Sequence, residues 1–71
     1  MKAREVITKI TSQGGELIRQ RGSHRFFRIE VNGVVAHTTV SGKDRDDIPA
    51  GLLSKIDRDL APALGKGWTK K

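Results

Sequence analysis

The dipeptide Asn32-Gly33 constrains the fold of this chain more than any other feature of the sequence. Both residue types tolerate a positive φ, and such a pair between two strand-like segments favours a two-residue type I′ turn. The segment His24–Val31 before it alternates apolar and polar residues, and Val34–Val40 follows it. We therefore predict an antiparallel hairpin. Its turn sets the register, in which the predicted pairs are Val31 with Val34, Ile29 with Ala36 and Phe27 with Thr38.

The sequence on either side of this hairpin predicts a third strand and two helices. Residues 2–12 carry an apolar stripe at helical spacing, which Gln13-Gly14-Gly15 ends. Residues 16–21 predict a short strand, joined to the hairpin by a Gly22-Ser23 turn. Pro49 suits the first turn of a second helix, and Pro62 is expected to end or bend it. Its apolar stripe consists of Leu52, Leu53, Ile56 and Leu60. The predicted class is α+β in the order α-β-β-β-α, with a three-stranded antiparallel sheet and both helices on one face.

A chain of 71 residues has room for one domain, which we place at residues 1–62. Residues 63–71 are expected to form a basic tail, with Lys66, Lys70 and Lys71 flexible; whether Trp68 packs on the core is left open. The absence of cysteine excludes disulfides and thiolate metal sites, and we expect neither a metal nor a cofactor. No apolar run is long enough to span a membrane and no signal peptide is visible, so we expect a cytoplasmic protein without a membrane partner.

The charge of the chain points to a polyanionic partner. Fourteen lysines and arginines against eight acidic residues give a net charge of +6. On so small a domain this produces a strong positive potential, which attracts nucleic acid.

The register also predicts which side chains lie on the sheet face opposite the helices. His24, Phe26 and Arg28 alternate with the apolar residues of their strand. If Gly22-Ser23 is a two-residue turn, Arg21 lies opposite His24, and Arg19 lies opposite Phe26. The predicted surface therefore collects Arg19, Arg21, His24, Phe26, Arg28 and His37. A solvated face that only keeps the protein soluble is the alternative interpretation.

These residue types suit the binding and cleavage of RNA. Arginines bind phosphate through charge-assisted hydrogen bonds, and an exposed phenylalanine offers a plane on which a base can stack. Histidine transfers protons near neutral pH, so His24 is the candidate catalytic residue. Arg19, Arg21, Arg28 and Phe26 are the candidate RNA-binding residues. Lys43 can add a phosphate contact from its loop, although a solvated loop lysine is the alternative.

Two other groups of residues are set aside. His37 is expected opposite Arg28, four residues along the sheet from His24, which at ~3.4 Å per residue is roughly 13 Å. The two imidazoles are then too far apart to act on one phosphodiester, so His37 is taken as a surface or substrate-contacting residue. Asp44, Asp46 and Asp47 suggest metal ligands, but Asp46 and Asp47 are better explained as compensating the positive end of the second helix.

Three blocks of the sequence resemble the HicA-type messenger-RNA endonuclease toxins. They are Lys2-Ala3-Arg4-Glu5-Val6-Ile7, Arg19-Gln20-Arg21-Gly22-Ser23-His24-Arg25-Phe26 and Asp47-Ile48-Pro49-Ala50-Gly51-Leu52-Leu53-Ser54-Lys55-Ile56. The resemblance implies an α-β-β-β-α fold like that of double-stranded-RNA-binding domains. It also implies metal-independent cleavage of messenger RNA and inhibition by a HicB-like antitoxin. The catalytic histidine of that family corresponds to His24.

Three functions remain open at the level of sequence. The first is a toxin-like endoribonuclease in which His24 acts as base or acid. The second is a non-catalytic module that binds RNA or another nucleic acid but does not cut it. The third is an interaction protein whose basic surface meets an acidic partner. RNA affinity that falls steeply with salt separates the first two functions from the third.

Overall fold

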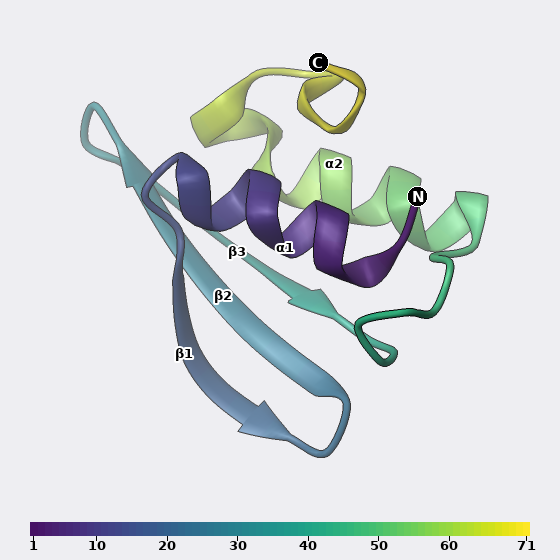
Figure 1. Cartoon of the computed structure of the whole chain (residues 1–71). Coiled ribbons are helices and arrows are strands. Elements are labelled where there is room, and N and C mark those ends of the chain that lie inside the picture. The colour runs from purple at the N-terminus through teal and green to yellow at the C-terminus, as the bar shows by residue number, and fades with distance from the viewer.

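The computed structural model describes all 71 residues, Met1–Lys71, and has the predicted order of elements. A helix and three strands are followed by a second helix and a short 3-10 helix (Figure 1). The elements are α1 (Ala3–Ser12), β1 (Glu16–Arg21), β2 (His24–Val31), β3 (Val34–Val40), α2 (Ala50–Leu64) and η1 (Trp68–Lys70). The strands form one antiparallel sheet in the order β1-β2-β3, so the predicted α+β class is confirmed.

The turn between β2 and β3 has the predicted conformation. Asn32 has a φ of 52° and Gly33 a φ of 83°, and positive values at both positions define the type I′ turn. The three predicted pairs of the hairpin are all present. Between β1 and β2, Arg21 lies opposite His24 and Arg19 opposite Phe26, as expected.

A β-bulge in β1 was not predicted. Leu17 pairs with Phe27 and Arg19 with Phe26, so Ile18 is an extra residue without a partner in the register. As a result Glu16 faces Arg28, a position that an unbroken register would have given to Leu17. Because β1 is an edge strand, Leu17 and Ile18 remain 49% and 53% exposed.

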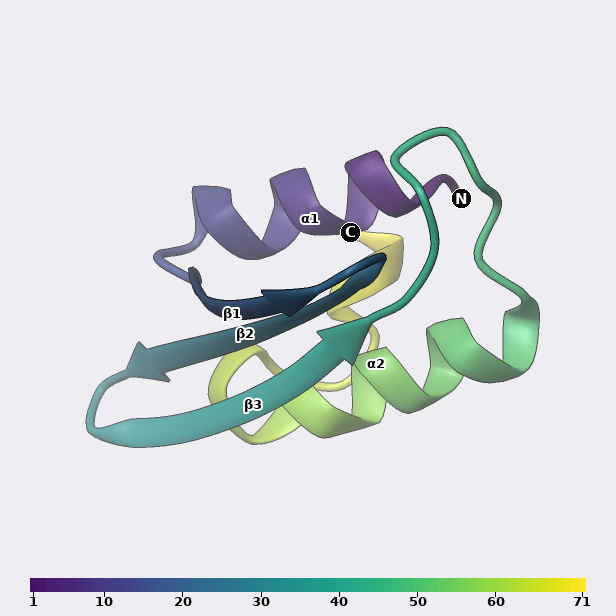
Figure 2. The ribbon, with the colours of Figure 1, turned by 90° about the horizontal axis from the view of Figure 1, so that it is seen from below.

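The core lies on one face of the sheet and is covered by both helices. Phe27 and Ile29 of β2 are at most 2% exposed, and the helices contribute side chains to the same cluster. The cluster consists of Ala3, Val6, Ile10, Phe27, Ile29, Ala36, Val40, Ile48, Ile56, Leu60 and Trp68. Helix α2 runs beside β3 (Figure 2). Neither helix is both long enough and apolar enough to cross a lipid bilayer.

The loop between β3 and α2 is tied to the start of α1. The backbone amide of Ala3 donates to the carbonyl of Asp46 at 2.9 Å, and that of Arg4 donates to Asp44 at 3.1 Å. The carboxylate of Asp46 accepts the amide of Lys43 at 3.0 Å, and the first turn of α2 contains no acidic residue. Asp46 therefore stabilises its own loop, and the expected compensation of α2 by Asp46 and Asp47 is not seen.

Helix α2 continues past Pro62 to Leu64, and the expected flexible tail is instead folded back against it. Trp68 is only 2% exposed, and its Nε1–H donates to the backbone oxygen of Asp57 at 2.9 Å. The expectation of flexibility was wrong because it considered only the glycines and lysines of the segment. The segment is held by Asp57, which lies in α2, ten residues before Gly67.

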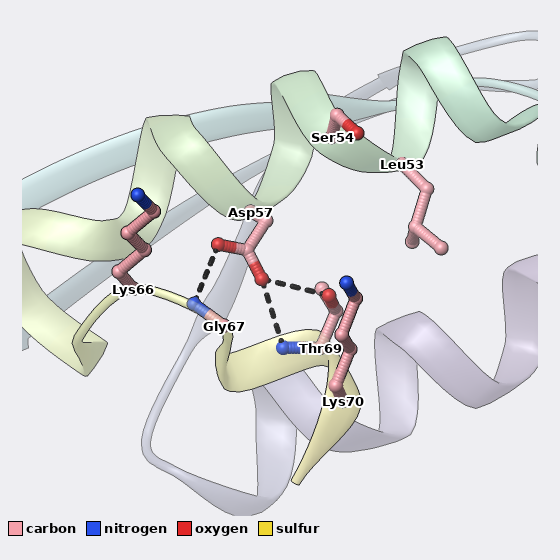
Figure 3. Close-up of a pocket in the computed structure, with 7 residues that line it drawn as sticks. All are labelled: Leu53, Ser54, Asp57, Lys66, Gly67, Thr69 and Lys70. Carbon is pink, nitrogen blue, oxygen red and sulfur yellow. Dashed lines mark hydrogen bonds between the residues drawn. The ribbon is translucent and has the colours of Figure 1, made fainter.

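The carboxylate of Asp57 holds this C-terminal segment, residues 65–71, by three further hydrogen bonds. It accepts the backbone amides of Gly67 at 2.9 Å and Thr69 at 3.1 Å, and the hydroxyl of Thr69 at 2.7 Å (Figure 3). Burial raises the pKa of Asp57, but these hydrogen bonds and the nearby charge of Lys70 outweigh it, so the pKa lies below its ordinary value.

Candidate active site

The sheet face away from the helices carries the residues singled out from the sequence. We call it the open face. Its side chains form three rows across the strands, which the register defines except for Ser41, the residue after β3, which joins the first row through its hydrogen bond to His24. The rows are Arg21–His24–Ser41, Arg19–Phe26–Thr39 and Glu16–Arg28–His37. Alternation along β2 therefore brings His24, Phe26 and Arg28 to one side of the sheet, while Phe27 and Ile29 between them are buried.

His24 is exposed at the start of β2 and held at one ring nitrogen. Its Nδ1 lies 3.1 Å from the hydroxyl oxygen of Ser41, the residue that follows β3. Its Nε2 makes no hydrogen bond within the protein. On the other side, Arg21 is its direct neighbour on β1, and such antiparallel pairs have Cα atoms about 4.5–5.5 Å apart. The imidazole thus has one anchored nitrogen, one free nitrogen and a cationic neighbour.

The second row is a stacked pair. The guanidinium carbon of Arg19 lies 4.6 Å from the centroid of the Phe26 ring, which is within the range of a cation–π interaction. From the sequence we expected Phe26 to offer its ring directly to a base, but Arg19 covers one side of it. The guanidinium lies over the ring and makes no ion pair. The guanidinium therefore offers both a surface on which a base can stack and N–H groups that can donate hydrogen bonds to phosphate.

Arg28 in the third row is already neutralised. Its Nη2 donates to the carboxylate of Glu30 at 2.9 Å, and the bulge places Glu16 opposite it in β1. His37 lies on its other side, as predicted. Arg19 and Arg21 form no ion pair, so the uncompensated positive charge of the open face lies around Arg21, His24 and Arg19 rather than around Arg28.

Arg25 is a site residue that the sequence analysis did not identify. It points to the opposite side of β2 from His24, and its side chain is 16% exposed. Its guanidinium pairs with Asp44 at 2.5 Å and donates to the carbonyl of Gly42 at 3.0 Å. These bonds fix the chain immediately after Ser41. The only sequence signal was an arginine on the apolar side of a strand, next to an acidic loop.

Lys43 lies in the loop that Arg25 fixes, at the same end of the sheet as His24. An open depression of about 590 Å³ lies there, between the β1–β2 turn and this loop. Its lining residues are Gln20, Gly22, Ser23, Arg25, Gly42, Lys43 and Asp44. Lys43 is exposed and forms no ion pair, so its charge adds to that of Arg21 at this end.

Comparison with known proteins identifies one family. A family model described as the HicA toxin of bacterial toxin–antitoxin systems matches residues 3–61. No curated protein and no solved structure matches the chain. The matched region contains all three rows of the open face and ends before the C-terminal segment. Because the match spans most of the 71 residues, this chain belongs to the HicA toxin family, and it is a toxin of the toxin–antitoxin type.

Proposed function

We propose that this toxin is a metal-independent endoribonuclease that binds messenger RNA across the open face and cleaves it with His24. The observation that carries the proposal is the environment of the His24 imidazole. It is exposed, anchored at Nδ1, free at Nε2 and next to an unpaired arginine. Family membership supports the same role, because a toxin needs an essential target, and RNA fits the net charge of +6.

The proposed reaction uses the ribose 2′-hydroxyl as the nucleophile. Nε2 of His24 removes the proton of this hydroxyl, whose oxygen attacks the adjacent phosphorus. The bond from phosphorus to the 5′-oxygen breaks, and that oxygen takes a proton from water or from the imidazolium. Arg21 stabilises the negative charge that builds up on the phosphoryl oxygens. The products are a 2′,3′-cyclic phosphate and a 5′-hydroxyl end, and no metal ion is required.

Arg19, Phe26, Arg28 and the loop residue Lys43 bind the flanking nucleotides. The Arg19–Phe26 pair provides a stacking surface one row away from His24. Lys43 extends the positive charge past the imidazole. Arg28 can contact phosphate with the guanidinium donors that Glu30 does not use, or by exchanging its bond to Glu30. This exchange costs little, because the pair is a surface salt bridge with side chains 39% and 51% exposed.

The test is cleavage of single-stranded RNA by purified protein in the presence of a chelator. His24→Ala should lower the rate by about 10²–10⁴-fold, the usual contribution of a general base, while RNA affinity falls only modestly. His37→Ala is the matched control, since it removes the other imidazole of the same face, and it should retain activity. Equal cleavage by wild type and His24→Ala would refute the assignment.

A non-catalytic RNA-binding function is the second candidate. The observation that favours it is the composition of the first row, in which His24 has Arg21 and Ser41 as neighbours and no second acid–base group. In that case, wild-type protein binds RNA with a steep salt dependence but leaves it intact, and induced expression does not arrest growth.

Inhibition by a HicB-like antitoxin completes the proposal. Membership of a toxin–antitoxin family supports a paired antitoxin, and the unpaired charges of Arg19, Arg21 and Lys43 favour an acidic surface on it. Co-purification of the toxin with the product of a neighbouring reading frame, and loss of RNA binding in that complex, would support it. Unchanged RNA binding in the complex would contradict it.

A further inference from the structure

We propose that Ser41 is a positioning residue that orients the imidazole of His24 and leaves its Nε2 free to act on the substrate. This inference rests on the proposed nuclease function. It adds a residue with no charge, outside the strands, to a site otherwise described by its histidine and arginines. The hydroxyl oxygen of Ser41 lies 3.1 Å from Nδ1 of His24, and this is the only hydrogen bond of that ring within the protein.

Ser41 is itself held from both sides. The preceding residue, Val40, is fully buried in the core and pairs with Arg25 in the sheet. The following residue, Gly42, has a φ of 104°, which redirects the chain, and its carbonyl accepts a hydrogen bond from Arg25 at 3.0 Å. Ser41 is half-buried between these two anchors. Its position therefore follows from the packing of β3 and from the Arg25 clamp, and does not depend on a bound ligand.

A hydroxyl suits this role because it can accept a hydrogen bond throughout the proton transfer. A base at Nε2 requires the neutral ring to carry its hydrogen on Nδ1, and that N–H can donate to Ser41. When Nε2 gains a proton, the Nδ1–H remains and the same hydrogen bond persists. Ser41 thus holds one ring orientation in both protonation states. A hydroxyl can also donate to Nδ1, so the bond fixes the ring in either neutral tautomer, and the base form is the one in which the hydroxyl accepts. The geometry is that of a base oriented by a third group, with a hydroxyl in place of a carboxylate.

The first measurement is independent of catalysis. The ring nitrogen resonances of His24 in wild-type protein should report a hydrogen-bonded Nδ1 at a pH where the ring is neutral. In Ser41→Ala they should move to the pattern of free histidine, while the resonances of His37 stay unchanged. Ser41→Thr, which keeps the hydroxyl, should behave like wild type. Resonances of His24 that do not respond to Ser41→Ala would overturn the inference, whether or not the protein cleaves RNA.

The second measurement is the rate of RNA cleavage. Ser41→Ala should lower the maximal rate by on the order of 10- to 100-fold with little change in RNA affinity, because a misoriented base affects the chemical step. Ser41→Thr should restore most of the rate. Ser23→Ala is the matched control, since Ser23 also adjoins His24 but its hydroxyl has no partner, and it should be neutral.

The two measurements separate the possible failures. If the wild type does not cleave RNA but His24 responds to Ser41→Ala, the nuclease proposal fails while the pairing of the two residues stands. If the wild type cleaves and Ser41→Ala cleaves at the same rate, the positioning role fails while the nuclease proposal stands. A drop in rate that is accompanied by an equal drop in the folded fraction, measured by urea denaturation, would make Ser41 a structural residue and overturn the inference.

Discussion

Replacement of Trp68 by alanine tests whether the C-terminal segment belongs to the cooperative fold. The family match ends at residue 61, yet Trp68 is 2% exposed and packs in the same cluster as both helices. Truncation of a buried tryptophan typically costs about 3–5 kcal/mol. A chain of 71 residues has a total stability of roughly 4–11 kcal/mol at 0.05–0.15 kcal/mol per residue. Trp68→Ala should therefore remove a large part of the free energy of unfolding.

The assay is urea denaturation followed by circular dichroism, which does not depend on the indole that the variant lacks. Trp68→Phe keeps most of the apolar contact but loses the hydrogen bond to Asp57, and it should cost about 1–2 kcal/mol. Lys66→Ala changes an exposed residue of the same segment and should stay within about 0.5 kcal/mol of wild type. A loss of less than about 1 kcal/mol for Trp68→Ala would refute the reasoning and show that residues 65–71 are an appendage.

Three further predictions concern the segment, the RNA-binding face and the backbone. Because the pKa of Asp57 is lowered on folding, its ionised form stabilises the protein above about pH 4, and this contribution is lost as the pH falls through the lower folded value. The difference in stability between wild type and Asp57→Asn should thus shrink below about pH 4 in acid titrations. Arg19→Ala should weaken RNA binding and lower the salt slope by about 1, whereas Lys55→Ala, on the helix side and paired with Asp59, should not change the slope. Gly15→Ala should destabilise by about 1–3 kcal/mol in urea melts, because its Cβ would lie 2.8 Å from the carbonyl oxygen of Ile10.

The sheet could be predicted from sequence because its determinants are local. Asn32-Gly33 sets the turn and therefore the register of β2 and β3, and the period of two then assigns every residue of β2 to a face. The bulge at Ile18 could not be read in the same way. Leu17 and Ile18 are both apolar, so alternation does not tell which of them faces the core.

The contacts of Ser41 and Arg25 could not be predicted because each joins side chains that are distant in sequence. Ser41 meets His24 across seventeen residues, and Arg25 meets Asp44 across nineteen. Nothing in the sequence around Ser41 signals its partner, and the only signal at Arg25 is its place on the apolar side of a strand. The C-terminal segment was misjudged for the same reason, since its glycines indicate flexibility until Asp57 is placed beside them.

Core residues and residues of the proposed site alternate along β2, so mutations in the two sets should have different effects. Phe27 and Ile29 are buried, so their truncation should remove core volume and lower the free energy of unfolding by about 2–5 kcal/mol. His24 is exposed and Arg28 makes only a surface ion pair, so their truncation should leave stability nearly unchanged. A loss of activity in an open-face variant can therefore be assigned to the site itself. Ser41 is the exception, because it links the buried end of β3 to the imidazole, and it is the one position where a measurement of stability must accompany every measurement of activity.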